Sequence, residues 1–244
     1  MSTSQAMTGP TPLDVTSASV SIPTVYWAPA QAPWGVVISC HGGSGHKMSA
    51  GNQAIAAVCA SRGLAVVAID GPVHGDRRED RSTDPQRAIE SYREAWKQGV
   101  GRTSIGDDMS AALDALQALP GYGDLPVGYI GVSMGTGYGI PFLSRERRVA
   151  AAAIGLWGMS YPASEHLWEH ARRIECPVWF TQQWDDPKFE RSSTFELFDT
   201  IGAKDKRLVA YPGGHVELEG ERLQDAVDFL EKRMRAAVKS VRAA

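Results

Sequence analysis

The chain has 244 residues and a formal net charge of −3; 43% of its residues are hydrophobic and 22% are charged. This balance is typical of an ordinary globular protein that buries a sizeable core, and it gives no reason to expect nucleic acid or an anionic membrane as a partner. The three cysteines form no C-x-x-C pair, which argues against a disulfide framework and against a cysteine zinc site.

The first segment, residues 1–12, is rich in Ser, Thr, Gly and Pro, and we expect it to be a loose tail. It has neither the basic start nor the apolar stretch of a secretory signal, and the chain has no run of about 18 apolar residues. We therefore expect a cytoplasmic protein without membrane association. No linker or repeat interrupts residues 13–244, which predicts a single domain; the sequence leaves a homodimer open.

From residue 19 onward, short apolar segments alternate with segments of helical periodicity. Residues 19–28 predict one or two leading strands at the sheet edge. Further strands are expected at 34–40, 64–69, 127–132, 150–156, 177–180 and 207–211, and helices at 50–61, 86–98, 105–119, 195–201 and 220–241. Most strands are apolar throughout, as are strands buried on both faces of a parallel sheet. The alternation predicts a three-layer α/β fold with a mostly parallel central sheet.

One connection, between residues 70 and 105, is unusually long and polar. Its middle resembles a helix, with Ala88, Tyr92 and Trp96 spaced four apart. Long insertions in compact domains are often functional, so this one is expected either to border a substrate site or to form a decorated surface loop. The sequence does not decide between these interpretations.

The clearest chemical motif is Gly131-Val132-Ser133-Met134-Gly135, which follows an apolar strand and precedes a helix of small residues. A serine held on such a sharp turn needs neighbours without side chains, so that its oxygen is exposed and the helix can pass close by. The N-terminus of that helix brings backbone N–H groups to the place where negative charge develops. The motif predicts that Ser133 is a nucleophile.

A second motif, His41-Gly42-Gly43-Ser44-Gly45, comes directly after the first core strand. Glycines there let a backbone N–H face the site, so we expect Gly43, with Gly42 beside it, to supply one donor of an oxyanion hole. The N–H of Met134 is expected to supply the other donor. The alternative is an ordinary glycine turn after a strand.

A serine nucleophile needs a base and an acid that orients the base. His215 lies in the glycine loop Tyr211-Pro212-Gly213-Gly214-His215, between the last strand and the last helix. Two carboxylates, Asp185 and Asp186, follow the preceding strand. We prefer Asp186, which lies 53 residues after Ser133 and 29 before His215, room for two helix–strand units and then for one. Asp185 is then a loop or capping carboxylate.

Together these motifs resemble the α/β-hydrolase superfamily and, more narrowly, its dienelactone-hydrolase-like and small carboxylesterase branch, from Trp34 to the C-terminus. The branch carries its acid in a G-x-x-D-x-x-V pattern, which residues 183–189 match with Asp186, although Gln replaces the Gly and Phe the Val. Residues 70–77 are similar to its D-x-P-G-H-G loop and include His74. Dienelactone hydrolases use a cysteine nucleophile, so Ser133 implies ester hydrolysis rather than the opening of a dienelactone.

Several other residues are candidates for the substrate site or for a metal. His74 could compete as the base, but it precedes the serine, and we expect it either to have a structural role or to line the site. Trp157, Met159 and Trp184 fall near strand ends, where α/β sheets bind ligands, although core packing explains each equally well. The pair in His166-Leu167-Trp168-Glu169-His170 has zinc-peptidase spacing, but no third ligand is evident and we predict no metal.

The function expected from these residues is hydrolysis of a small or medium carboxylic ester through an acyl-enzyme, with no cofactor. The short segment between Ser133 and Asp186 leaves no room for a large lid, which favours soluble substrates. The same three residues could instead transfer the acyl group or cleave a thioester or an amide. A binding protein that keeps the fold without catalysis is the alternative from another class.

Overall fold

The computed structural model describes residues 7–243, with side chains up to Val238. Within this part eight strands form one sheet, in which β1 and β4 run antiparallel to their neighbours and the other strands are parallel. Their order across the sheet is β1 (Thr11–Leu13), β4 (Thr24–Trp27), β6 (Leu64–Ile69), β5 (Gly35–Ser39), β7 (Val127–Val132), β8 (Val149–Gly155), β9 (Val178–Gln183) and β10 (Lys206–Tyr211). The predicted mostly parallel sheet is confirmed.

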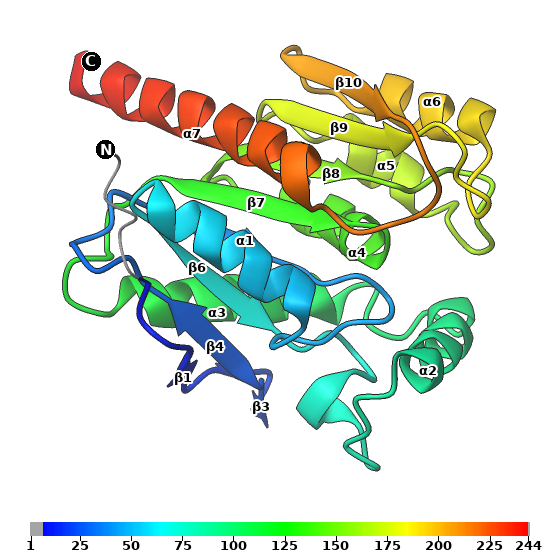
Figure 1. Cartoon of the computed structure of the whole chain (residues 1–244), viewed down its shortest axis with the longest axis horizontal. Coiled ribbons are helices and arrows are strands. Elements are labelled where there is room, and N and C mark those ends of the chain that lie inside the picture. The colour runs from blue at the N-terminus through cyan, green and yellow to red at the C-terminus, as the bar shows by residue number, and fades with distance from the viewer. Residues whose placement is uncertain (1–6, 244) are drawn as a thin grey trace.

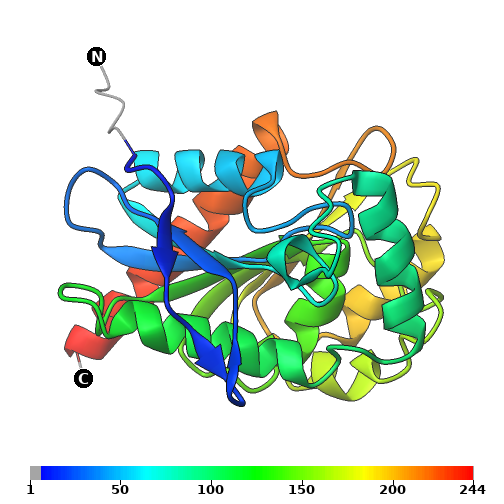
Figure 2. The same cartoon turned by 90° about the horizontal axis from the view of Figure 1, so that it is seen from below.

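Helices cover both faces of the sheet, which completes the predicted three layers (Figures 1 and 2). One layer consists of α1 (Ala50–Ser61) and α7 (Gly220–Ala243), and the other of α3 (Ser104–Gln117), α4 (Met134–Leu143), α5 (Leu167–Arg172) and α6 (Arg191–Thr200). A further helix, α2 (Pro85–Lys97), lies beyond the carboxyl ends of the parallel strands, away from both layers. In the described part, no helix combines the length and the apolarity that crossing a membrane requires.

The central strands separate two apolar cores because successive side chains point to opposite faces. In β5, Val36 and Ile38 are buried in the core beneath α3 and α4, whereas Val37 is buried in the core beneath α1 and α7. Burial on both faces explains why the sequences of these strands are continuously apolar.

The N-terminal segment differs in part from the loose tail expected over residues 1–12. Residues 1–6 lie outside the described part of the chain, but Thr11 and Pro12 begin β1, which pairs antiparallel with β4. A proline-containing strand is tolerated at a sheet edge, because a missing N–H there costs no ladder bond. Residues 19–28 were expected to form one or two edge strands: β4 joins the sheet, whereas β3 (Val20–Ser21) pairs with β2 (Thr16–Ser17) outside it.

The end of β8 contains a glycine, Gly155, whose replacement by alanine is expected to destabilise the fold strongly. Its φ is +145°, and a Cβ there would lie 2.0 Å from the carbonyl oxygen of Thr181 on β9. We expect Gly155→Ala to lower the free energy of unfolding by about 3 kcal/mol, measured by urea denaturation. Gly121→Ala is the matched control, because Gly121 also has a positive φ (+87°) but open space around it; it should cost about 1 kcal/mol. Equal costs would show that the close contact with Thr181 is not a constraint.

Candidate active site

Ser133 lies at the sharp turn between β7 and α4, in a backbone conformation that residues with side chains rarely adopt (φ 57°, ψ −121°). The two motif glycines make this turn sterically possible. A Cβ on Gly135 would lie 2.6 Å from the carbonyl oxygen of Cys40, and one on Gly131 would lie 2.9 Å from the Tyr129 hydroxyl. Glycine at both positions therefore lets the turn and the start of α4 pass close to the end of β5.

The turn is held in place by a residue that the sequence did not single out, Thr136. Its Oγ1 donates to the carbonyl oxygen of Gly155 (2.6 Å) and accepts from the Gly155 N–H (2.8 Å). The N–H of Ser133 donates to the same Gly155 carbonyl (2.9 Å). These bonds offset the backbone strain at Ser133 by attaching the turn to the end of β8.

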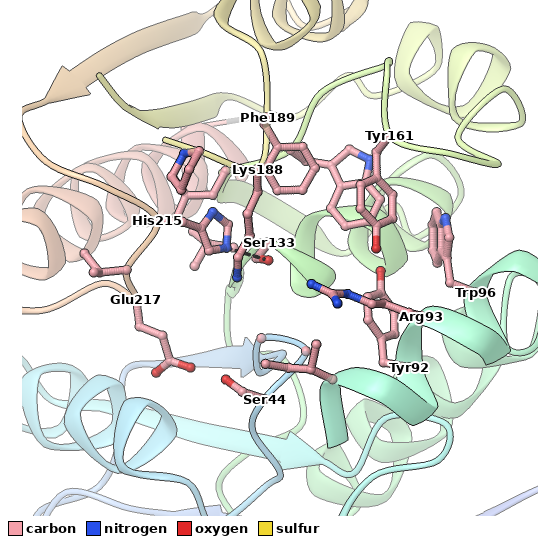
Figure 3. Close-up of a pocket in the computed structure, with 18 of the residues that line it drawn as sticks. Ser44, Tyr92, Arg93, Trp96, Ser133, Tyr161, Lys188, Phe189, His215 and Glu217 are labelled. Atoms are coloured by element: carbon pink, nitrogen blue, oxygen red, sulfur yellow. Dashed lines mark hydrogen bonds between the residues drawn. The ribbon is translucent and has the colours of Figure 1, made fainter. Parts of the chain in front are cut away.

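The structure brings the three predicted catalytic side chains into one hydrogen-bonded chain, of which Figure 3 shows His215 and Ser133. His215 Nε2 lies 3.0 Å from Ser133 Oγ, and His215 Nδ1 lies 2.7 Å from Asp186 Oδ2. The side chain of Asp186 is 2% exposed and that of His215 10% exposed. With its N–H on Nδ1 donated to Asp186, the neutral imidazole accepts from the serine hydroxyl through Nε2, the arrangement that activates a nucleophile.

The electrostatics of Asp186 favour its charged form. Burial raises the pKa of Asp186, but the hydrogen bond from His215 and the backbone N–H groups of Lys188 (2.8 Å) and Phe189 (3.3 Å) lower it, and the net pKa lies below the ordinary value. An ionised carboxylate therefore faces His215 at neutral pH, where it stabilises an imidazolium as one forms.

The neighbouring carboxylate, Asp185, is placed quite differently. It is exposed, its Oδ2 accepts from the N–H of Gly213 (3.4 Å), and its own N–H donates to the Gly213 carbonyl (3.0 Å). Gln183, which the sequence did not single out, holds the same loop by a second pair of hydrogen bonds. Its side-chain amide donates to the backbone carbonyl of Val216 and accepts from the Val216 N–H (both 3.0 Å). Asp185 and Gln183 together fix the loop that presents His215.

The two backbone N–H groups expected at an oxyanion hole belong to the first residue of α4 and to the glycine loop beside the cavity. Met134 is the first residue of α4, so its N–H has no intrahelical acceptor. Gly42 and Gly43 line the cavity beside Ser133, and no acceptor for the Gly43 N–H occurs within residues 7–243. A Cβ on Gly43 would lie 3.1 Å from the ring of Tyr92, so the loop fits closely under that ring.

His74 does not line the cavity, and its contacts fit the structural role that was the other expectation for it. It is fully buried behind the glycine loop, with Nε2 3.0 Å from the Gly43 carbonyl oxygen and Nδ1 2.6 Å from that of Pro72. Burial lowers the pKa of His74, which disfavours the charged form. The ring therefore holds the glycine loop (residues 42–45) in place, together with His41, whose Nε2 accepts from the N–H of Gly71 (3.0 Å).

The cavity in front of Ser133 has a volume of about 780 Å³ and an aromatic wall. Trp157 lies in this wall, as predicted, with its ring centroid 5.0 Å from Trp96 and 4.6 Å from Tyr161. Phe189 and Tyr92 also line the cavity. Tyr92 and Trp96 come from α2, so the long insertion borders the site; their spacing on a helix-like stretch was the sequence signal for it.

Two other residues expected in the cavity wall lie elsewhere. Trp184 is 47% exposed and stacks under Arg191, because it follows the end of β9 and the inward alternation of the strand no longer applies. Met159 is half-buried against the core under α6, held by its N–H bond to the carbonyl of Ser193 (3.1 Å). Neither side chain reaches the cavity around Ser133.

The histidine pair with zinc-peptidase spacing makes separate contacts. His166 Nδ1 lies 3.1 Å from the carbonyl oxygen of Ala163, and its ring packs on Trp96 at 5.4 Å. His170 Nδ1 lies 2.8 Å from Ser144 Oγ. Among the described residues, no group of three or more His, Cys, Asp and Glu side chains has the arrangement of a metal site.

Comparison with known proteins gives a family match over most of the chain. A model of the dienelactone hydrolase family matches residues 22–236. A cold-adapted esterase from an Arctic intertidal metagenomic library, solved as a PEG-bound complex, is 33% identical, with a TM-score of 0.80 over 92% of each chain. No curated protein matches the chain.

More distant solved structures share the fold. The dienelactone hydrolase from Anabaena variabilis is 20% identical, with a TM-score of 0.69 over 93% of this chain and 97% of its own. An esterase from Pyrococcus furiosus is 14% identical, with a TM-score of 0.72 over 93% of each chain. At these identities the likeness concerns the fold alone.

Proposed function

Because the chain belongs to the dienelactone hydrolase family, a family of ester-hydrolysing α/β-hydrolases, we propose that it is a serine carboxylesterase. Ser133 is the nucleophile, His215 the base and Asp186 the acid that orients His215. The observation that carries this proposal is the chain of hydrogen bonds from Ser133 Oγ through His215 to Asp186, at 3.0 and 2.7 Å. A ligand-binding protein without catalysis has no need of all three groups in this arrangement.

In the proposed reaction, Ser133 Oγ forms a bond to the ester carbonyl carbon while its proton moves to His215 Nε2. The N–H groups of Met134 and Gly43 stabilise the oxyanion. As the carbonyl re-forms, the ester C–O bond breaks and the leaving alkoxide takes the proton from Nε2. Water then attacks the acyl-enzyme by the same proton transfers, which releases the carboxylic acid and restores Ser133.

The dimensions of the cavity support a small or medium ester. About 780 Å³ is within the range of small-molecule sites, and much of the wall consists of aromatic side chains on α2 and on the segments after β8 and β9. The reaction draws only on groups of the chain and on water, so no cofactor is proposed. Acyl transfer, thioester cleavage and amide cleavage would use the same first step and differ in the leaving group or in the acceptor.

The proposal is tested by the intact mass of the protein after exposure to a fluorophosphonate probe. We expect one adduct on the wild type and none on Ser133→Ala, because only an activated serine reacts readily with such a probe. Ser44→Ala is the matched control, since Ser44 lines the same cavity but forms no hydrogen bond to a histidine in the described part of the chain, and it should keep the adduct. A folded wild-type protein without an adduct would favour the binding protein instead.

A further inference from the structure

Three cations that line the active-site cavity form no salt bridge in the described part of the chain. Arg93 and Lys97 come from α2 and Lys188 from the segment after β9, and within the described part of the chain none of the three forms an ion pair. By contrast, Arg87 on the same helix lies outside the cavity and pairs with Asp80 at 3.5 Å. The cations at the cavity are thus not held in salt bridges, which leaves them open to a ligand.

Two of these cations, Arg93 and Lys188, repel each other electrostatically. Burial lowers the pKa of Lys188; Asp186 raises it in part and the Arg93 guanidinium lowers it further, for a net pKa below the ordinary value. Arg93 also lies beside the Tyr161 hydroxyl, whose pKa burial raises and Arg93 partly lowers again. Because an anion between Arg93 and Lys188 would relieve their repulsion, this part of the cavity favours a negatively charged group.

The chemistry of the triad decides which half of the ester faces these cations. The leaving oxygen must take its proton from His215 Nε2, so the alcohol half lies towards the loop that carries His215 and Glu217. Figure 3 shows Arg93 on the opposite side of Ser133 from Glu217. The acyl half therefore points towards α2, where it meets the rings of Trp96 and Tyr161 and the charge of Arg93.

The acidic side of the cavity reinforces this orientation. Glu217 and Glu219 line it, and burial together with the charge of Glu219 raises the pKa of Glu217. An anionic group placed there would be repelled, whereas an uncharged alkyl alcohol would not. The separation of charge across Ser133 thus favours one orientation of an anionic substrate over the other.

Building on the proposed esterase function, we propose that the preferred substrate is a half-ester of an aromatic dicarboxylic acid. The aromatic ring packs against Trp96 and Tyr161, the free carboxylate lies between Arg93 and Lys188, and the esterified carbonyl faces Ser133. Hydrolysis breaks the ester C–O bond, adds one water and releases the aromatic diacid and the alcohol.

The test compares monomethyl terephthalate with its neutral carboxamide analogue, in which the free carboxylate is replaced by an uncharged group of similar shape. We expect the wild type to have the higher kcat/KM for the half-ester, and Arg93→Met to lower the ratio of the two values by about tenfold. Arg87→Met removes the same charge from the same helix and should leave the ratio unchanged. Arg93→Lys should restore part of it.

A measurement on the wild type alone makes the test independent of any variant. Raising the ionic strength should lower kcat/KM for the half-ester more than for the carboxamide, because salt screens the charge attraction. An equal response of the two esters to salt, or a ratio that Arg93→Met leaves unchanged, would overturn the half-ester proposal while leaving esterase activity in place. If the wild type cleaves neither ester and takes up no fluorophosphonate, it is the proposed esterase function that fails.

Discussion

Replacing Ser133 with alanine is expected to lower kcat for ester hydrolysis by about 10⁴- to 10⁶-fold, the range found when a nucleophile of this kind is removed. Without Oγ there is no acyl-enzyme, and His215 can at best assist a direct attack by water. The oxyanion donors and the aromatic wall stay intact, so a small rate above the uncatalysed one should persist. Steady-state kinetics with a soluble aryl or alkyl ester measures the loss.

The control for this variant has to distinguish a loss of catalysis from a loss of folding stability. Alanine at position 133 keeps a Cβ, so it has the same φ of 57° to maintain, and the bonds from Thr136 to Gly155 are unaffected. We expect its urea unfolding curve to match that of the wild type. Ser160→Ala removes another hydroxyl, which donates to Ser193 Oγ (2.8 Å), and should leave the kinetics unchanged. A Ser133→Ala protein within tenfold of the wild-type rate would exclude Ser133 as the nucleophile.

The fold and the order of the chemical groups could be predicted from the sequence because both follow from local patterns. Strands buried on both faces appear as uninterrupted apolar runs, and in a parallel sheet their carboxyl ends lie at one edge. Ser133, Asp186 and His215 follow β7, β9 and β10, which lie within four consecutive strands of the sheet, so the strand order alone brings the three residues to one edge. The close approach at Gly131 and Gly135 likewise has a direct sequence signature.

The cavity wall could not be predicted with the same success, because it depends on contacts between distant segments. Trp96 reaches the site because its Nε1 donates to the carbonyl of Pro162 (2.8 Å), a residue 66 positions further along the chain. Trp184 looks equivalent in sequence but lies just past the end of β9, where it stacks under Arg191. Trp96 and Trp184 are equally hydrophobic, so their residue type does not distinguish a tryptophan that lines the cavity from one on the surface. The difference lies in the tertiary contacts that each residue makes.

The choice between the two adjacent aspartates leads to the second large effect: Asp186→Asn is expected to lower kcat by about 10⁴-fold. The backbone N–H groups of Lys188 and Phe189 both donate to Asp186 Oδ1, so in the variant they retain the amide oxygen there. The amide NH₂ then faces His215 Nδ1. Because it can only donate, it places the imidazole proton on Nε2, and Nε2 can no longer accept the proton of Ser133.

The neighbouring substitution provides the comparison that makes this prediction specific. Asp185 is exposed, and its carboxylate contacts the Gly213 N–H at 3.4 Å rather than His215, so Asp185→Asn should change kcat by about twofold at most. Both variants remove one negative charge from the same turn, so an effect of net charge would appear equally in both. A larger loss in Asp185→Asn would mean that His215 is oriented by the other carboxylate. Equal, small losses would mean that His215 is held in its working tautomer by the loop alone, through the clamps that Gln183 and Asp185 provide.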